Sequence, residues 1–356
     1  MLVLANKAQG LAPGQRFRFE QWAPRLERDH NIKLDLAPFE SAELSRILYR
    51  RGHVARKALL VLKDFLARSR CIKAARDYDA VLVFREAALI GPAIYEGLIA
   101  RSGVPMIFDF DDAIWMHQPT SGIFSRLHFL GKTKTICRLA SAVTAGNSYL
   151  AAFAAQFNDD VSVVPTTIEL SDYPVVPEPP QDPAFIVCWT GSTWTLPHFE
   201  QARAALELVA ARVPLVVKII CNNDVKQPIQ GAEMRFVPWS ATDEAKEIGD
   251  CHAGIMPLPD DPFAKGKCGL KALQLMATGR PVVISPIGVN DDIVRSRENG
   301  FLASTTQEWV DALMALAGSA QLRSKIGQAG RATVERDYSA QASAAKFAEV
   351  VRRVTN

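Results

Sequence analysis

Short apolar runs alternate with longer amphipathic stretches along the whole sequence, and this alternation constrains the fold more than any other feature. The apolar runs have the length and the continuous Val, Ile, Leu and Phe content of strands buried on both faces. The segments between them have helical periodicity, so repeated strand–helix units predict parallel sheets covered by helices. The expected strands are Leu2–Ala5, Ile32–Leu36, Ala80–Phe84, Pro105–Phe110, Ala142–Ala145, Val161–Val164, Phe185–Trp189, Leu215–Cys221, Met234–Val237, Ala253–Pro257, Pro281–Ile284 and Gly300–Ala303.

A proline-rich segment divides the chain. With 356 residues the sequence is long enough for two domains, and YPVVPEPPQDP (173–183) contains five prolines, which interrupt both sheets and helices. We expect a first domain at 1–173, a linker at 174–183, a second domain at 184–338, and a helix at 339–356 that packs back on the first domain. Open parallel sheets bind ligands at the carboxyl ends of their strands. The sequence therefore predicts an α/β protein whose two Rossmann-like domains face a central cleft.

Charge and cysteine content exclude several classes of protein. The net charge of +3 does not favour nucleic acid as a partner. The six cysteines are scattered without a CxxC pair, which argues against a disulfide framework and a zinc site. The opening MLVLANKAQG is too short and too polar for a signal peptide, and no apolar run approaches the ~18 residues of a membrane span. We expect a cytoplasmic protein that holds no metal and no cofactor.

A lysine-rich helix start is the most informative segment of the second half. In PLPDDPFAKGKCGLKALQLMATGRPVV a strand is followed by a glycine-containing loop and a helix, Gly269–Ala277. Lys265, Lys267 and Lys271 lie near the start of this helix, where cations oppose the helix dipole. A bound anion would reverse that unfavourable term, and Gly269 would let it approach the backbone. The segment predicts a phosphate site; the alternative is a solvated basic turn.

A second loop of the same predicted sheet contains small hydroxyl residues. CWTGSTWTLPHFE places Gly191, Ser192 and Thr193 between a strand and a helix, where backbone N–H groups and hydroxyls can bind a diphosphate. The alternative is ordinary helix capping. Neither loop matches the Walker or GxGxxG pattern, which argues against ATPase and dinucleotide chemistry.

Polar residues also follow the strands of the first half. Asp109, Asp111 and Asp112 come at the end of one strand, and we expect a carboxylate there to orient an acceptor hydroxyl or act as a base. The alternative is capping of the next helix. Arg85 and Glu86 follow another strand, with a surface ion pair as the alternative. Asn147 also follows a strand and is equally consistent with a helix cap, so each assignment stays open.

Several segments together resemble glycosyltransferase family four, the large retaining group with the GT-B fold. The segments are DFDDAIW (109–115), GNSYLA (146–151), VVPTTIELSDYP (163–174), the lysine-rich segment from Gly254 to Val283, ENGFLA (298–303) and ERDYS (335–339). The opening GLAPGQRFRFEQWAPRLE resembles the bacterial members that assemble surface polysaccharides. The resemblance covers nearly the whole chain. It implies a nucleotide-sugar donor and a retaining, metal-independent transfer.

The resemblance also implies site residues. The candidate catalytic residues are Asp111, Asp112 and Lys271; the donor-binding candidates are Gly191, Ser192, Thr193, Lys267, Gly269, Leu270, Lys271 and Gln274; the acceptor-binding candidates are Gly14, Arg16, Arg85, Glu86 and Asn147. The family usually has two glutamates eight positions apart at the phosphate helix, where this chain has Gly266 and Gln274. Gln274 is expected to contact a ribose hydroxyl. Asp260 or Asp261 is a candidate replacement for the missing carboxylate at Gly266.

A basic amphipathic stretch lies between Arg46 and Arg76. It contains ten Lys or Arg residues and a single acid, Asp64, with an expected break at Gly52. Apolar residues recur at Leu44, Ile47, Leu48, Ala55, Ala58, Leu59, Leu62, Phe65 and Leu66. One hypothesis is contact with an anionic membrane through residues such as Arg50, Arg51, Arg56 and Lys57. The other is a core-packed helix with a solvated basic face.

The sequence as a whole predicts a glycosyltransferase. It would move a sugar from a nucleoside-diphosphate-sugar donor to a glycan or a lipid-linked glycan, at the inner face of the membrane, in surface polysaccharide biosynthesis. The alternatives are a nucleotide-sugar epimerase of similar fold and a non-enzymatic, two-lobed sugar-binding protein.

Overall fold

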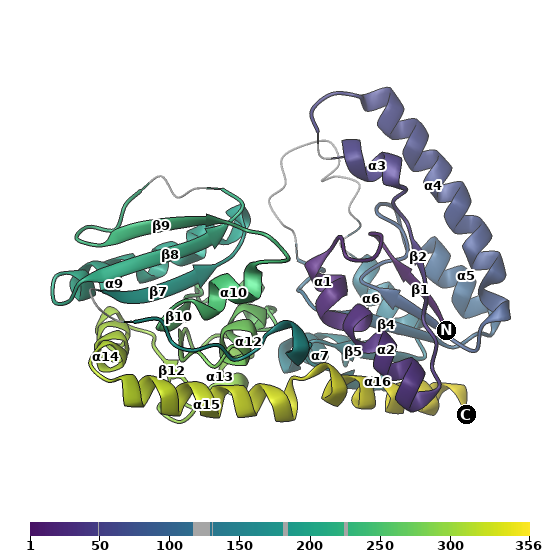
Figure 1. Cartoon of the computed structure of the whole chain (residues 1–356). Helices are drawn as coiled ribbons and strands as arrows, with labels where there is room; N and C mark the ends of the chain where they lie inside the picture. The colour runs from purple at the N-terminus through teal and green to yellow at the C-terminus, as the bar shows by residue number, and fades with distance from the viewer. Residues whose placement is uncertain (49, 117–128, 130, 181–183, 224–226) are drawn as a thin grey trace. The chain divides into compact units, whose positions relative to one another are not determined.

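The chain forms two compact α/β units (Figure 1). A computed structural model describes residues 1–48, 50–116, 129, 131–180, 184–223 and 227–356. Unit 1 contains Met1–Thr166 and Ala340–Asn356, and unit 2 contains Thr167–Ser339. Within these described residues no helix is long and apolar enough to cross a membrane.

Unit 1 is built on a six-stranded sheet in the order β2-β1-β3-β4-β5-β6, with every pair parallel. Its strands are β1 Leu2–Ala5, β2 Asp35–Pro38, β3 Val81–Phe84, β4 Met106–Phe110, β5 Ala142–Ala145 and β6 Val161–Val163. Its helices are α1 Pro13–Gln15, α2 Gln21–His30, α3 Ala42–Ile47, α4 Val54–Ala74, α5 Ile94–Ser102, α6 Lys132–Leu139, α7 Ser148–Ala154 and α16 Ala340–Thr355, with short turns η1 Arg16–Glu20 and η2 Ala75–Asp77.

Helices α2 and α16 cover one face of the sheet of unit 1. Val3 and Ala5 of β1 belong to the same apolar cluster as residues of these two helices, and Trp22 packs against Phe347 with ring centroids 5.2 Å apart. Burial of this apolar surface ties the end of the chain to its beginning. Arg353 of α16 adds an exposed ion pair with Asp160.

Unit 2 repeats the architecture with the strand order β12-β11-β10-β7-β8-β9, again with parallel pairs. Its strands are β7 Phe185–Thr190, β8 Leu215–Cys221, β9 Glu233–Pro238, β10 Ala253–Met256, β11 Val282–Ile284 and β12 Phe301–Leu302. Its helices are α8 Leu196–Phe199, α9 Arg203–Ala210, α10 Glu244–Gly249, α11 Pro262–Lys265, α12 Leu270–Ala277, α13 Asn290–Ile293, α14 Thr306–Ala317 and α15 Ala320–Asp337, with short turns η4 Leu170–Asp172, η5 Thr193–Thr195 and η6 Glu200–Ala202.

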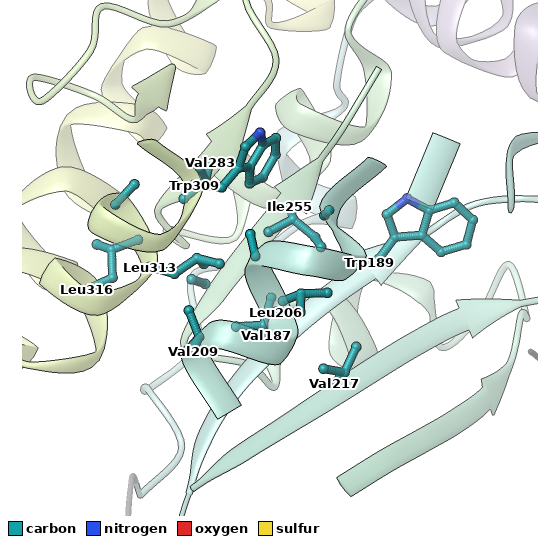
Figure 2. Close-up of a cluster of buried hydrophobic side chains, with 14 of the residues drawn as sticks. Val187, Trp189, Leu206, Val209, Val217, Ile255, Val283, Trp309, Leu313 and Leu316 are labelled. Atoms are coloured by element: carbon teal, nitrogen blue, oxygen red, sulfur yellow. The ribbon is translucent and has the colours of Figure 1, made fainter. Parts of the chain in front are cut away.

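Helices cover both faces of the second sheet. Figure 2 shows the core on one side, where Val187 and Val217 of the sheet pack with Leu206 of α9 and Leu313 of α14. On the other side α12 lies so close to β10 that a Cβ on Gly254 would come 2.3 Å from the Leu275 side chain. Strands β8, β10 and β11 are therefore buried on both faces, which explains their mostly apolar composition, whereas the edge strand β9 is partly exposed.

The predicted α/β class and parallel sheets are confirmed, and the twelve expected strands are found within a few residues of their predicted bounds. The largest difference is β2, expected at Ile32–Leu36 and found at Asp35–Pro38. Asn31 ends α2 in the left-handed conformation, and the Ile32 N–H donates to the Leu26 carbonyl. Ile32 therefore belongs to the helix cap rather than to the strand.

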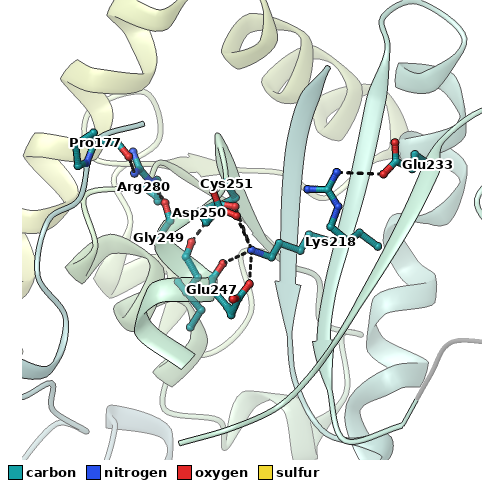
Figure 3. A network of polar contacts seen from close by, with 10 residues as sticks. Pro177, Lys218, Glu233, Glu247, Gly249, Asp250, Cys251 and Arg280 are labelled. Atoms are coloured by element: carbon teal, nitrogen blue, oxygen red, sulfur yellow. Dashed lines mark hydrogen bonds and ion pairs between the residues drawn. The ribbon is translucent and has the colours of Figure 1, made fainter. Parts of the chain in front are cut away.

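The proline-rich segment 174–183 lies within unit 2, and the chain passes between the units at 166/167 and 339/340. Arg280 donates to the carbonyls of Val176 and Pro177 at 2.9 and 2.8 Å (Figure 3). Glu178 forms an ion pair with Arg323, which is buried. Residues 181–183 lie outside the described residues. These contacts fix 176–178 against unit 2, whereas the sequence placed 174–183 between the domains.

Candidate functional site

The loop after β7 is held in place by its own polar groups. The Gly191 N–H donates to the Ile220 carbonyl, the Ser192 N–H to Thr195 Oγ1 and the Thr193 N–H to Asn222 Oδ1, each at 3.0 Å. A diphosphate could use the last two N–H groups only by replacing Thr195 and Asn222 as acceptors.

Gly191 is required by close packing rather than by an unusual backbone angle. A Cβ at this position would lie 2.4 Å from the Trp189 ring and 2.6 Å from Thr195 Oγ1. The glycine thus allows the loop to pass directly over the indole ring.

Lys271 lies against this loop from the first turn of α12. Its ammonium donates to Thr195 Oγ1 at 3.0 Å and lies 4.7 Å from the centroid of the Trp189 ring. Among the described residues no carboxylate is within ion-pair distance of this ammonium. Burial and the neighbouring Lys267 charge lower the pKa of Lys271 to about 7. An anion bound here would therefore meet an ammonium that the protein itself does not neutralise.

The beginning of α12 adds a second favourable feature for an anion. Gly269 precedes the helix with φ +70° and provides no side chain to cap it. A Cβ there would also lie 2.2 Å from the Ile293 side chain, so only glycine fits this position. Uncapped N–H groups and the helix dipole favour negative charge, and Leu270 begins the helix at this point.

The remaining charged groups of the lysine-rich segment already contact other residues. Lys267 lies over the Phe263 ring at 4.1 Å. Asp261 accepts the Ala264 N–H at 2.7 Å as the cap of α11, and Asp260 pairs with Lys265 at 2.9 Å. Replacement of a carboxylate at Gly266 by Asp260 or Asp261 stays a prediction.

His198 on α8 is coupled to the same charges. Burial and then the charges of Lys271 and Lys267 lower the pKa of His198, with Asp261 acting in the opposite direction. The imidazole therefore stays neutral near neutral pH, and it adds no positive charge to the site.

Gln274 takes part in a buried polar chain that was not foreseen from the sequence. Its Nε2 donates to the Tyr173 hydroxyl at 2.7 Å, and that hydroxyl donates to Glu244 Oε2 at 2.9 Å. Glu244 Oε1 accepts the Trp239 Nε1–H at 2.7 Å. The predicted contact of Gln274 with a ribose hydroxyl would have to use the other N–H or the carbonyl oxygen of the amide.

In unit 1 three predicted residues come together at the carboxyl edge of the sheet. Arg85 Nε donates to Asp111 Oδ1 at 2.7 Å, and a Cβ on Gly14 would lie 3.0 Å from both Arg85 Nη2 and Asp111 Oδ2. Arg85 has φ +62°, an uncommon left-handed conformation for a residue other than glycine. Such backbone outliers concentrate at functional sites, which agrees with a binding role for this group.

The other predicted residues of unit 1 have separate partners. Glu86 pairs with Lys132 at 2.9 Å and Arg85 donates to Asp111, so each of the two neighbours has a partner elsewhere in unit 1. Asn147 Oδ1 accepts the Leu150 N–H at 2.8 Å and caps α7, as the alternative predicted. Asp112 Oδ1 accepts the Ala113 N–H at 3.1 Å. Arg16 lies over the Phe17 ring at 4.3 Å.

Asp109 is a structural residue rather than a cleft residue. It is fully buried, accepts from Arg18 through both carboxylate oxygens, and accepts the Thr144 hydroxyl at 2.5 Å. In the part of the chain that the structure describes, no group of three or more His, Cys, Asp or Glu side chains could hold a metal ion.

Four residues around Lys271 were missed by sequence reasoning. Thr195 and Asn222 bind the loop, Trp189 forms the floor under the ammonium, and Trp194 exposes 86% of its surface beside them. Asn222 could have been identified because it directly follows β8, at the same edge of the sheet.

Comparisons with known proteins agree with this architecture. Residues 185–319 match the family described as glycosyl transferases group 1. A comparison with curated protein sequences gives no significant match.

Solved structures share the fold at low sequence identity. Sucrose-phosphate synthase from Thermosynechococcus elongatus has a TM-score of 0.69 and 15% identity, covering 99% of this chain and 98% of that one. HepE from Anabaena in complex with UDP-glucose has a TM-score of 0.65 and 14% identity, covering 99% and 100%. The apo lipopolysaccharide outer core galactosyltransferase WaaB has a TM-score of 0.67 and 12% identity, covering 99% of each chain.

The chain therefore has the predicted GT-B fold, and unit 2 contains a region that matches the group 1 glycosyl transferases. These findings support a glycosyltransferase.

Proposed function

We propose that the protein transfers a sugar from a nucleoside-diphosphate-sugar donor to a glycan or lipid-linked glycan acceptor. Unit 2 binds the donor and unit 1 binds the acceptor. The family match of residues 185–319 supports the reaction class, and the complex of HepE with UDP-glucose supports the class of donor. The proposal includes retention of anomeric configuration, a place in surface polysaccharide biosynthesis and action at the inner face of a membrane.

The observation that carries the proposal is the position of Lys271. Its half-buried ammonium lies beside the loop after β7 and at the uncapped start of α12, with a pKa lowered to about 7. Such a site lacks negative charge, and the two phosphates of the donor would provide it. In the transfer step the diphosphate leaves with additional charge, which the ammonium and the helix dipole stabilise. These groups belong to the chain itself, so the proposal needs no divalent metal for this role.

Unit 1 would orient the acceptor with the group formed by Gly14, Arg85 and Asp111. The Asp111 carboxylate, which accepts from Arg85, can also accept a hydrogen bond from a sugar hydroxyl. The absence of a side chain at Gly14 lets its backbone lie against this pair, since a Cβ there would come 3.0 Å from both side chains. The other acceptor-side candidates each contact another residue of unit 1, and the structure does not bring them together with this group. They are Asp112, Glu86, Arg16 and Asn147.

The donor assignment is tested by binding nucleotide sugars to the wild type and to Lys271→Ala. A panel of uridine, guanosine, adenosine and cytidine diphosphate sugars, followed by thermal shift, should identify one base that stabilises the protein by mass action. Loss of one charge-assisted contact should weaken that ligand about tenfold or more in Lys271→Ala. Equal affinity of both proteins for every member of the panel would refute the phosphate site.

Turnover without an acceptor separates the proposal from its two alternatives. A transferase should hydrolyse its donor slowly, and an epimerase should form the epimeric nucleotide sugar. A two-lobed sugar-binding protein should bind without turnover. Nuclear magnetic resonance of the anomeric proton after incubation distinguishes the three results.

A further inference from the structure

The outward face of α4 is apolar. Leu59, Leu62 and Leu66 are spaced three and four residues apart, so they lie on one side of the helix. They expose 67%, 58% and 57% of their surface, although leucines at helical spacing normally face a core. Val54, at the start of the same helix, is also exposed. We call Leu59, Leu62 and Leu66 the leucine face.

The inward side of α4 is held by polar contacts, which fix the rotation of the helix. Asp64 is buried and accepts from the Ser41 N–H and hydroxyl, both at 3.0 Å. Arg68 is buried and donates to the carbonyls of Ala5 and Ala37, both at 2.9 Å. The helix is also core-packed through Leu60 and Ile72 and exposes basic side chains, as the alternative to membrane contact predicted. Only the residues of the leucine face depart from that alternative, because they do not pack in the core. Gly52 separates α3 from α4 with φ +80°, which confirms the predicted break.

Positive charge borders the leucine face. Arg56, Lys63 and Arg70 are exposed on α4. The single acid of this helix, Asp64, is the buried residue that accepts from Ser41. A surface that combines exposed leucines with Lys and Arg, and that shows no exposed acid on its helix, complements an anionic lipid surface. A protein partner would need a surface that is acidic, apolar and of matching shape. A bilayer of anionic lipid is both acidic and apolar and needs no matching shape.

The neighbouring helix extends the apolar surface. Figure 1 shows α5 beside α4, and the two are joined by the Tyr95 hydroxyl, which lies 3.0 Å from Ser69 Oγ. On α5, Ile94 and Leu98 are exposed, and its acid Glu96 is buried and accepts the Ala87 N–H at 2.9 Å.

We propose that the leucine face inserts into the interface of an anionic membrane, with Arg56, Lys63 and Arg70 at the level of the lipid phosphates. The apolar side chains enter the acyl boundary while the long basic side chains extend toward the head groups. The inference deepens the proposed function and rests on it only for the lipid-linked acceptor. Binding to lipid requires no sugar transfer, so the two proposals fail separately.

The test is sedimentation of the full chain with lipid vesicles. Wild type should bind phosphatidylcholine vesicles that contain phosphatidylglycerol, and it should bind pure phosphatidylcholine weakly. The triple variant Leu59→Gln, Leu62→Gln, Leu66→Gln should bind at least about tenfold less, because insertion depends on buried apolar area. Glutamine has nearly the helix propensity of leucine, so the variant should keep its helical circular dichroism.

Two further variants separate insertion from other causes. Leu208→Gln changes an exposed leucine of α9 in unit 2 and should bind vesicles as wild type does. Arg56→Glu, Lys63→Glu, Arg70→Glu should lose the preference for anionic lipid, and wild-type binding should weaken with salt as the Debye length falls. Nucleotide-sugar affinity should stay unchanged in the triple glutamine variant, in Leu208→Gln and in the triple glutamate variant. This measurement shows independently that unit 2 is intact.

Three results would overturn the proposal. One is the absence of wild-type binding to the anionic vesicles, and another is undiminished binding by the triple glutamine variant. The third is a wild-type dimer, seen by light scattering, that the glutamine variant abolishes while neither protein binds lipid. That result would assign the leucine face to a second copy of the chain.

Discussion

Binding of the donor should be coupled to protonation of Lys271. The pKa of this ammonium is lowered to about 7, so only about one-tenth of it is protonated at pH 8, compared with about nine-tenths at pH 6. A bound diphosphate favours the charged form and returns the pKa toward its ordinary value of 10.5. Binding should therefore take up close to one proton at pH 8 and about one-tenth of a proton at pH 6.

The same coupling sets the pH dependence of affinity. The free protein must protonate Lys271 before the full attraction develops, so the Kd for a nucleotide sugar should rise about tenfold from pH 6 to pH 8. A nucleotide sugar is preferable to a free nucleoside diphosphate, because its phosphates do not titrate in this range. Burial and the two lysine charges lower the pKa of His198, which disfavours its protonation over this range.

Calorimetry in buffers of different ionisation enthalpy measures the proton uptake directly. Lys271→Met should bind weakly and take up no proton. Lys271→Arg should bind without uptake, because a guanidinium stays charged throughout this range. Lys265→Met, which alters a partly exposed lysine paired with Asp260, should behave as wild type. Equal affinity at pH 6 and pH 8, together with no proton uptake at pH 8, would refute the lowered pKa of Lys271.

Three further predictions concern stability and metal dependence. The folded-state pKa of Lys271 lies below 10.5, so its ammonium destabilises the ligand-free fold most below pH 7, and this effect fades as the pH rises toward 10.5. Lys271→Met should consequently raise stability by roughly 1–3 kcal/mol at pH 6 and hardly at all at pH 10, measured as thermal midpoints; a decrease at pH 6 would contradict this. Asp109→Asn should destabilise the protein by about 3–5 kcal/mol in denaturant titrations, because it leaves the buried Arg18 without its carboxylate, and a loss below about 1 kcal/mol would show that the pair is dispensable. Transfer activity should survive EDTA; loss that manganese or magnesium restores would make the aspartates after β4 a metal site.

The strands were predictable because burial on both faces leaves a continuous apolar signal in the sequence itself. β8 consists of buried residues throughout, and its bounds agree with the prediction. Lys218 is the charged residue within this apolar strand. It is buried as well, and its ammonium pairs with Glu247 and Asp250 (Figure 3). The edge strand β2 was predicted less well because it is only partly buried and borders a helix cap.

Side-chain roles that depend on distant partners could not be predicted. Arg18 and Asp109 are 91 positions apart in the chain, and Gln274 and Tyr173 are 101 apart. Arg68 looks like a solvated charge in the sequence, and only the folded chain brings backbone carbonyls to it. For the same reason the periodicity of α4 indicated a helix correctly but left open which leucines face the core. Leu60 does so, whereas Leu59, Leu62 and Leu66 are exposed.

The charge of Lys271 is linked to the residue at position 274, where this chain has Gln274 and the family that it resembles usually has a glutamate. The two positions are three apart on α12, close enough for a carboxylate at 274 to attract the ammonium and raise its pKa. Gln274 is neutral and donates its amide to Tyr173, and Gly266 adds no charge either. In the proposed donor site, the uncharged residues at 266 and 274 would therefore leave the Lys271 ammonium to the diphosphate, and they would offer no carboxylate to the donor sugar. Under this proposal a nucleoside diphosphate should bind nearly as tightly as its sugar ester, and release of that product would be a slow step of the reaction.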